Sequence, residues 1–296
     1  MAEPAGTGGL NQMANIAMKD LVSTEWLAGE LGKPDLVVLD CTTYLPNEPG
    51  DIHSGFAAAH IPGARLFDIN AIADADTDLP HMVPTGARFA KLIGALGVSN
   101  ASRVVFYDQH GLRASPRGWW MMRLFGHENA AVLDGGLPKW KAEGRPVETG
   151  APKPASAATF VPDLIARRLA GIGDVKAIVA GGGALILDAR SKGRFDGTAP
   201  EPRASLPSGH MPGAASLPFN ELLNADGTMK DPAALRAIFT ARGVDDDRPL
   251  ITSCGSGVTA TVVALGAVRA GLPEPAVYDG SWTEWASRPE TPKVKD

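Results

Sequence analysis

Short apolar runs alternate with longer stretches of helical periodicity along the chain. The apolar runs lie at 36–40, 103–108, 185–188 and 249–254, and helix-period stretches at 84–96 and 232–242 lie between them. Runs that are apolar on both faces and separated by helices are typical of parallel strands in a sheet that is covered on both sides. The pattern therefore predicts an α/β fold.

The second half of the sequence repeats landmarks of the first half in the same order. The segment Ala59-His60-Ile-Pro-Gly-Ala64 corresponds to Gly209-His210-Met-Pro-Gly-Ala214, and the run that ends at Asp108 corresponds to the run that ends at Cys254. Ordered self-similarity over this length indicates two copies of one structural unit. We expect tandem domains, each a mostly parallel sheet with helices on both faces.

The domain boundaries follow from composition. A stretch rich in Pro, Gly, Ala and Ser has no hydrophobic period and indicates an extended linker between the copies. We expect a flexible N-terminal extension at 1–17, a first domain at 18–145, a linker at 146–160 and a second domain at 161–290.

Charge and cysteine content exclude several functions. The net charge is −5 with dispersed basic residues, which argues against nucleic acid or an anionic membrane as a partner. No apolar run approaches the length of about 20 residues that spans a bilayer. Residues 1–17 lack the features of a targeting signal, so a cytoplasmic location is expected. The two distant cysteines form neither a disulfide framework nor a zinc site, and we expect no metal or organic cofactor.

The strongest functional signal is the segment Pro249-Leu-Ile-Thr-Ser-Cys254-Gly-Ser-Gly-Val-Thr-Ala260, which an apolar helical pattern follows. Ligands of parallel sheets bind at the carboxyl ends of strands, where helix N-termini favour anions such as a thiolate. Gly255 and Gly257 allow the backbone to fold around the sulfur and direct amides toward it. We predict a reactive Cys254; a buried core thiol is the alternative. Asp108, its counterpart, cannot act as a sulfur nucleophile, so the first domain is expected to be non-catalytic.

The tandem His-Ile/Met-Pro-Gly-Ala segments, the loop after Cys254 and the segment Asp279-Gly-Ser-Trp282 resemble the two-domain rhodanese-type sulfurtransferases over about residues 20–288. In that family, thiosulfate:cyanide sulfurtransferases carry Arg and Lys after the cysteine, and 3-mercaptopyruvate sulfurtransferases carry Gly-Ser. Gly255 and Ser256 resemble the mercaptopyruvate branch. The chemistry agrees, because this loop offers no cation to the thiosulfate dianion.

A keto acid thiol requires a carboxylate clamp. Arg194 and Arg203 follow the run that ends at Asp188, on the same predicted sheet edge as the cysteine, and they match the substrate-binding segment of the family. A guanidinium binds a carboxylate in bidentate fashion. Surface exposure or an ion pair with Asp188 or Glu201 is the alternative, and Arg190 is expected to be structural, beside Asp188. The loop residues expected to bind substrate are Gly255, Gly257, Val258 and Thr259.

The resemblance also implies a Ser-His-Asp relay. Ser256 would be approached by His60 and Asp51 of the first domain, which would place the site between the domains. His210 occupies the equivalent place in the second copy, so His60 has the alternative role of fixing the turn before its proline. Other candidates for the relay are His53, Glu48 and Asp68.

The implied reaction has two half-reactions. The Cys254 thiolate attacks the sulfur of 3-mercaptopyruvate, pyruvate leaves, and loop amides hold the resulting persulfide until an acceptor thiol, thioredoxin or cyanide removes the sulfur. Two alternative functions are a sulfurtransferase with thiosulfate as its main donor and a non-catalytic persulfide carrier. A cysteine phosphatase is excluded, because its pattern Cys-x5-Arg requires arginine at position 260, where this chain has Ala260.

The second cysteine, Cys41, is interpreted as a packing residue, with a redox partner as the alternative.

Overall fold

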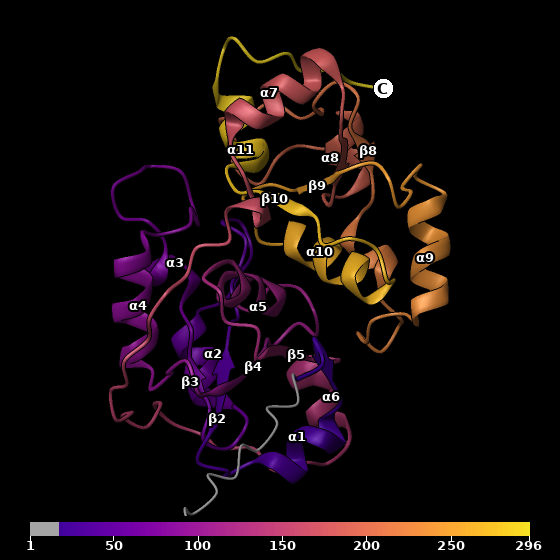
Figure 1. The fold of residues 1–296 in the computed structure, drawn as a ribbon. Helices are drawn as coiled ribbons and strands as arrows, with labels where there is room; N and C mark the ends of the chain where they lie inside the picture. The colour runs from indigo at the N-terminus through magenta and orange to yellow at the C-terminus, as the bar shows by residue number, and fades with distance from the viewer. Residues whose placement is uncertain (1–17) are drawn as a thin grey trace, which may run out of the picture.

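The computed structural model describes residues 18–296, and the predicted N-terminal extension at 1–17 lies outside the described residues. Two α/β domains follow one another along the chain, with the first in indigo and magenta and the second in salmon, orange and yellow (Figure 1). Each domain contains a five-stranded sheet, and all pairings between the strands described are parallel. The predicted fold class is confirmed.

The first sheet has the strand order β1-β5-β4-β2-β3. Its central strands coincide with the predicted runs at 36–40 and 103–108. The elements are β1 (Leu21–Val22), α1 (Thr24–Glu30), β2 (Leu36–Asp40), α2 (Ile52–Ala58), β3 (Arg65–Leu66), α3 (Ile69–Ile72), α4 (Gly86–Ala95), β4 (Arg103–Tyr107), α5 (Ser115–Leu124), β5 (Ala130–Leu133) and α6 (Gly136–Ala142).

The second sheet has the equivalent order β6-β10-β9-β7-β8, which shows that the sequence repeat is a structural repeat. A 3₁₀ turn, η1 (Ala166–Arg168), precedes it, and another, η2 (Phe219–Leu222), follows β8. The remaining elements are β6 (Leu169–Ala170), α7 (Ile172–Gly181), β7 (Leu185–Asp188), α8 (Lys192–Asp196), β8 (Ala215–Ser216), α9 (Pro232–Thr240), β9 (Leu250–Ser253), α10 (Ala260–Arg269), β10 (Ala276–Tyr278) and α11 (Ser281–Ser287).

Helices cover both faces of each sheet, because successive strand residues point to opposite sides. Val105 of β4 packs in a cluster with Trp140 of α6, whereas its neighbour Phe106 packs in the cluster that contains Trp119 of α5. The second domain repeats this division, with α7 and α11 on one face and α9 and α10 on the other.

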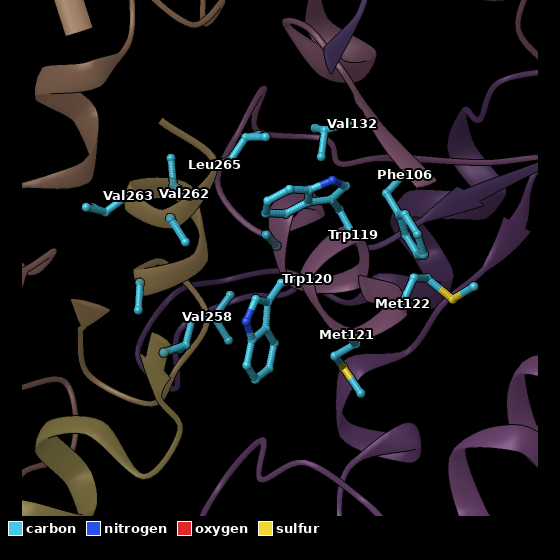
Figure 2. Packing of buried hydrophobic residues seen from close by; sticks show 14 of the residues in the cluster. Phe106, Trp119, Trp120, Met121, Met122, Val132, Val258, Val262, Val263 and Leu265 are labelled. Carbon is cyan, nitrogen blue, oxygen red and sulfur yellow. The ribbon is translucent and has the colours of Figure 1, made fainter. Parts of the chain in front are cut away.

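The inner faces of the two domains share one hydrophobic core. This cluster contains Trp119 and Trp120 of α5 together with Val258 and Val262, which lie just before and within α10. Figure 2 shows these side chains gathered between the two helices. The helices α5 and α10 are equivalent in the repeat and lie at the centre of the molecule (Figure 1). The loops that precede them therefore both lie at the domain interface.

The segment after each domain pairs with that domain in the same way. Glu148, in the predicted linker, forms an antiparallel bridge with His60, and Val294 near the C-terminus forms one with His210. The linker also packs further along the first domain, where the amide of Ala158 donates to the carbonyl of Gly94 over 2.9 Å.

Candidate active site

Cys254 lies directly after β9 and lines a cavity of about 690 Å³ between the domains. The residue is only 2% exposed, so its sulfur is accessible to solvent only through this cavity. One wall comes from the first domain and includes residues 43–47 and His81. The other wall includes Arg194 and Arg203 of the second domain. The arrangement gives a buried thiol a route to a small molecule.

The amides of the cysteine loop divide into two groups. Those of Cys254 and Gly257 both donate to Ser281 Oγ over 3.1 Å, so Gly257 does not offer its amide to the cavity, and it is absent from the cavity lining. The prediction that Gly257 binds substrate is wrong. The φ of Gly257 is +77°, and a β-carbon there would lie 2.7 Å from the carbonyl oxygen of Asp279, so glycine is required by the backbone.

The second group of amides has no acceptor among residues 18–296. These amides belong to Gly255, Ser256, Val258, Thr259 and Ala260. Gly255, Val258 and Thr259, which the sequence predicts to bind substrate, line the cavity.

In the first domain, a carboxylate of the chain itself fills the equivalent loop. Asp108 occupies the position of Cys254, and its carboxylate accepts four backbone hydrogen bonds and one from a hydroxyl, with lengths of 2.8–3.0 Å. The donors are the amides of His110, Arg113, Ala114 and Ser115 and the hydroxyl of Ser115. In the repeat, the amides of His110, Arg113 and Ala114 correspond to those of Ser256, Thr259 and Ala260, which are three of the unpartnered amides around Cys254. The second loop thus has the geometry of an anion site whose internal carboxylate is replaced by a thiol.

Replacing Asp108 with alanine should destabilise the protein. Its carboxylate is buried, and the substitution leaves five donors without their acceptor, at a cost of about 1–3 kcal/mol for each donor that stays buried and unsatisfied. We expect the free energy of unfolding, measured by urea titration, to fall by about 3–5 kcal/mol. Asp108→Asn retains one acceptor oxygen and should lose less. Equal stability of the alanine variant and the wild type would refute this account.

Of the two predicted substrate arginines, one is paired. Arg194 Nη2 lies 2.6 Å from Glu201 Oε2, which is the ion pair considered as an alternative. Its guanidinium still borders the loop, because a β-carbon built on Gly255 would lie 2.9 Å from Arg194 Nη2. Arg203 forms no ion pair within residues 18–296. Burial is the main cause that lowers the pKa of Arg203, but a guanidinium stays protonated at neutral pH. Arg203 is therefore the cation available to a ligand.

Arg190 has the structural role that the sequence predicts. Its side chain is fully buried, and Nη2 lies 2.6 Å from Asp188 Oδ2 while Nη1 lies 2.7 Å from Glu201 Oε1. Its guanidinium also lies over the ring of Trp282, 4.4 Å from the centroid. Because Glu201 binds both Arg190 and Arg194, this cluster fixes the second-domain wall of the cavity.

Ser256 is hydrogen-bonded to a histidine that the sequence analysis missed. His81 Nδ1 lies 2.9 Å from Ser256 Oγ, and His81 comes from the segment between α3 and α4 of the first domain. Its φ is +63°, a left-handed conformation that is strained for a residue other than glycine. Burial, helped by the charges of Arg117 and Arg203, lowers the pKa of His81 from 6.5 to about 4. The ring is neutral at pH 7, so Nδ1 can accept a hydrogen bond from the hydroxyl.

His60 does not approach Ser256, and its predicted catalytic role is wrong. His60 Nδ1 lies 2.9 Å from the carbonyl oxygen of Phe56, and the two rings stack with centroids 3.9 Å apart. His210 repeats this arrangement with Phe195, at 3.0 Å and 3.9 Å. Both histidines fix the turn before the Pro-Gly pair, which is the alternative that the repeat suggested.

The predicted carboxylate of the relay is also misplaced. Asp51 is the N-cap of α2, where its side chain accepts from the amide of Ser54 over 2.8 Å, and this hydrogen bond is the main cause that lowers the pKa of Asp51. No carboxylate in the described part of the chain is hydrogen-bonded to His81. The other candidates have contacts or positions away from Ser256: Glu48 pairs with Arg113, Asp68 is the N-cap of α3, and His53 is exposed on α2.

Cys41 is a packing residue in this structure. It is fully buried, its Sγ lies 3.5 Å from the carbonyl oxygen of Ala114, and burial raises the pKa of its thiol well above the usual value. It is not part of the cavity lining. Its environment therefore disfavours thiolate chemistry.

Two further findings concern residues 18–296 alone. None of their helices has the length and apolar character required to cross a bilayer. Nor do these residues contain a group of three or more His, Cys, Asp or Glu side chains arranged to hold a metal ion.

The fold and this cavity, in which a thiol lies beside unpartnered amides, an unpaired arginine and a Ser–His pair, are those of a two-domain α/β enzyme. Comparison with known families identifies it further, because the model of the rhodanese-like domain matches residues 23–143 and 172–288. The chain belongs to the rhodanese family and is a two-domain sulfurtransferase.

The similar proteins are named after two different sulfur donors, 3-mercaptopyruvate and thiosulfate. The chain is 41% identical to human 3-mercaptopyruvate sulfurtransferase, over 91% of this chain and 93% of that protein. It is 42% identical to thiosulfate sulfurtransferase of Cricetulus griseus, over 93% of this chain and 95% of that protein. The crystal structure of SseA from Escherichia coli, described as a 3-mercaptopyruvate sulfotransferase, matches with a TM-score of 0.81 and 36% identity, over 90% and 99% of the two chains. Overall similarity establishes sulfur transfer, and the donor must be argued from the site.

Proposed function

We propose that the protein transfers sulfur from 3-mercaptopyruvate, through a persulfide on Cys254, to an acceptor thiol, thioredoxin or cyanide, with release of pyruvate. One observation carries the choice of donor. The positions after Cys254 are Gly255 and Ser256, so no cation adjoins the sulfur in sequence, while the unpaired cation Arg203 lies in the cavity wall. A cation in the cavity wall rather than in the loop itself suits a donor that carries a carboxylate as well as its sulfur.

In the first half-reaction, the Cys254 thiolate attacks the donor sulfur and the carbon–sulfur bond breaks. The electron pair of that bond leaves with pyruvate as its enolate, and the proton of the donor thiol ends on the enolate carbon. Ser256 is close enough to His81 to be oriented by it, at 2.9 Å. Because the pKa of His81 is lowered to about 4, the neutral ring accepts the hydrogen bond of the hydroxyl and orients it in the resting site. When negative charge develops on the leaving group, the single hydroxyl proton turns from Nδ1 to that charge.

In the second half-reaction, an acceptor attacks the outer sulfur of the persulfide and regenerates Cys254. The amides of Ser256, Thr259 and Ala260 hold the persulfide in the interval, by analogy with the amides that hold the Asp108 carboxylate. Because the donor product leaves before the acceptor reacts, ping-pong kinetics are expected.

Comparison of two donors tests this proposal. We expect a higher kcat/KM with 3-mercaptopyruvate than with thiosulfate, and a mass gain of one sulfur atom after incubation with 3-mercaptopyruvate alone. A clear preference for thiosulfate would overturn the choice of donor. A protein that neither gains sulfur nor releases pyruvate would favour the persulfide carrier.

The variant Arg203→Met should weaken use of 3-mercaptopyruvate. A charge-assisted hydrogen bond contributes about 1.5–3 kcal/mol, so we expect kcat/KM to fall by roughly 10- to 100-fold, mainly through KM. Steady-state pyruvate release measures this effect. Lys192→Met is the control, because Lys192 lies in the same segment but is exposed and paired with Asp196. A similar loss in both variants would show that Arg203 does not bind the donor.

A further inference from the structure

The Ser256–His81 pair is assembled from two domains, and one side chain binds the backbone beside both partners. Arg117 of α5 donates from Nη2 to the carbonyl oxygen of His81 over 2.6 Å and from Nη1 to the carbonyl oxygen of Gly257 over 3.2 Å. Gly257 is the residue after Ser256. Arg117 is fully buried, so its guanidinium meets these carbonyls without competition from solvent.

A carboxylate of the second domain completes this connection. Arg117 Nη2 lies 2.7 Å from Asp279 Oδ1, and Asp279 Oδ2 accepts from the amide of Val83 over 2.6 Å. The segment from His81 to Val83 is therefore held at its first carbonyl by the guanidinium and at its last amide by the carboxylate. This double attachment can hold His81 in its strained conformation, with φ of +63°.

The structural repeat shows which parts of this arrangement the fold itself requires. At the equivalent point, Asp134 Oδ1 accepts from the amide of Met229 over 2.8 Å, so the contact between an aspartate and the other domain is present twice. The residue two positions before Met229 is Gly227, with φ of +79°. There the left-handed conformation has no side chain to orient, and no Ser–His pair exists.

Arginine, in contrast, occurs on one side alone. The position of Arg117 in α5 corresponds to Val263 in α10, because each lies nine residues after Asp108 or Cys254. Val263 is fully buried and belongs to the shared core, and Figure 2 shows it on α10. In the second domain, where Gly227 takes the place of His81, an apolar residue is sufficient at this helix position. The buried arginine therefore occurs only in the copy that also contains the histidine.

We propose that Arg117 is a positioning residue, which holds His81 against Ser256 across the domain interface. The inference rests on the proposed function for its activity readout. Arginine suits the role because its planar fork donates in several fixed directions, to Gly257, His81 and Asp279 together. A lysine ammonium keeps the charge but cannot reproduce this geometry.

Two substitutions separate geometry from charge. Arg117→Met removes both, and we expect single-turnover pyruvate release to slow by roughly 10²-fold, with KM changed by less than about twofold because Arg194 and Arg203 are untouched. The charged groups that act on His81 are Arg117 and Arg203, with Asp279 behind Arg117. Arg117→Met should therefore make His81 titrate at a higher pH, measured by NMR on histidine-labelled protein. Arg117→Lys should slow the step while His81 still titrates near its wild-type pH.

Arg123→Met is the matched control. Arg123 also lies on α5 and binds the second domain, with its Nε 3.0 Å from Glu274 Oε1, but it contacts neither His81 nor the cysteine loop. We expect Arg123→Met to lose stability and keep the wild-type rate and the wild-type titration of His81. Equal slowing by Arg123→Met would overturn the proposal, as would a folded Arg117→Met protein with the wild-type rate.

The design remains informative if one arm fails. If Arg117→Met does not fold, Arg117→Lys is judged by the same rate criterion. If the wild-type protein releases no pyruvate from 3-mercaptopyruvate, the proposed function fails, and the position of His81 in a crystal structure of Arg117→Met then decides the inference. A His81 ring that still lies within hydrogen-bond distance of Ser256 Oγ would overturn it, and a ring that has moved away from Ser256 would support it.

Discussion

Replacing Cys254 with serine should abolish both pyruvate release and the gain of sulfur from 3-mercaptopyruvate. A serine hydroxyl fits the space, but it is a poor nucleophile and cannot carry a persulfide. We expect the rate of pyruvate release to fall by roughly 10⁴-fold or more, as for loss of other enzyme nucleophiles. A pyruvate assay and the mass of the intact protein give the two measurements.

Cys41→Ala is the control for the Cys254 variant. Cys41 is buried away from the cavity, so this variant should keep the sulfur gain and the rate, with a modest loss of stability from the shorter side chain. A Cys254→Ser protein that still acquires one sulfur atom would show that the nucleophile is elsewhere.

The second large effect is expected at His81. His81→Gln should slow pyruvate release by roughly 10²- to 10³-fold, because Ser256 loses the partner that orients its hydroxyl. The pKa of His81 is lowered from 6.5 to about 4, so the wild-type ring stays neutral as the pH falls through 6 and becomes protonated near pH 4. A pH profile of single-turnover pyruvate release should show the contribution of His81 above pH 4 and its loss below.

His60→Gln provides the contrast to the His81 variant. His60 contacts Phe56 and the linker residue Glu148, so its substitution should lower the melting temperature and leave the rate of the folded protein near that of the wild type. If His60→Gln slowed the reaction as much as His81→Gln, the relay assigned from the structure would be incorrect.

The sequence was sufficient for those features that depend on local pattern. Strands such as β2 and β7 begin and end where the apolar runs do, since a strand buried on both faces needs an unbroken apolar run. The position of Cys254 followed from its place between such a strand and a glycine-rich turn. The arginines were found because they follow β7 at the same sheet edge.

The relay histidine could not be found in this way, because its contact joins residues far apart in the sequence. His60 was chosen because it lies in a segment that both halves share, yet agreement between the halves reflects the common fold. The proposed reactive centre lies where the halves differ, because Cys254 replaces Asp108 and His81 replaces Gly227. The differences between the two copies, rather than their agreements, are therefore the sequence signal that points to His81.

The sequence also could not show which of the two substrate arginines is paired with a carboxylate, because this depends on the three-dimensional structure. Both Arg194 and Arg203 lie near Glu201 in the sequence, and either was able to form the ion pair. The fold assigns Glu201 to Arg190 and Arg194, and it leaves Arg203 unpaired among the described residues. Partner choice within a cluster of charges depends on side-chain geometry, which spacing does not specify.

The carboxylate of Asp108 has a consequence for stoichiometry. Because that side chain saturates the amides of its own loop, sulfite, thiosulfate or a keto acid has no vacant loop to enter in the first domain. We therefore expect a chain with two copies of the scaffold to bind a single equivalent of such an anion, next to the thiol.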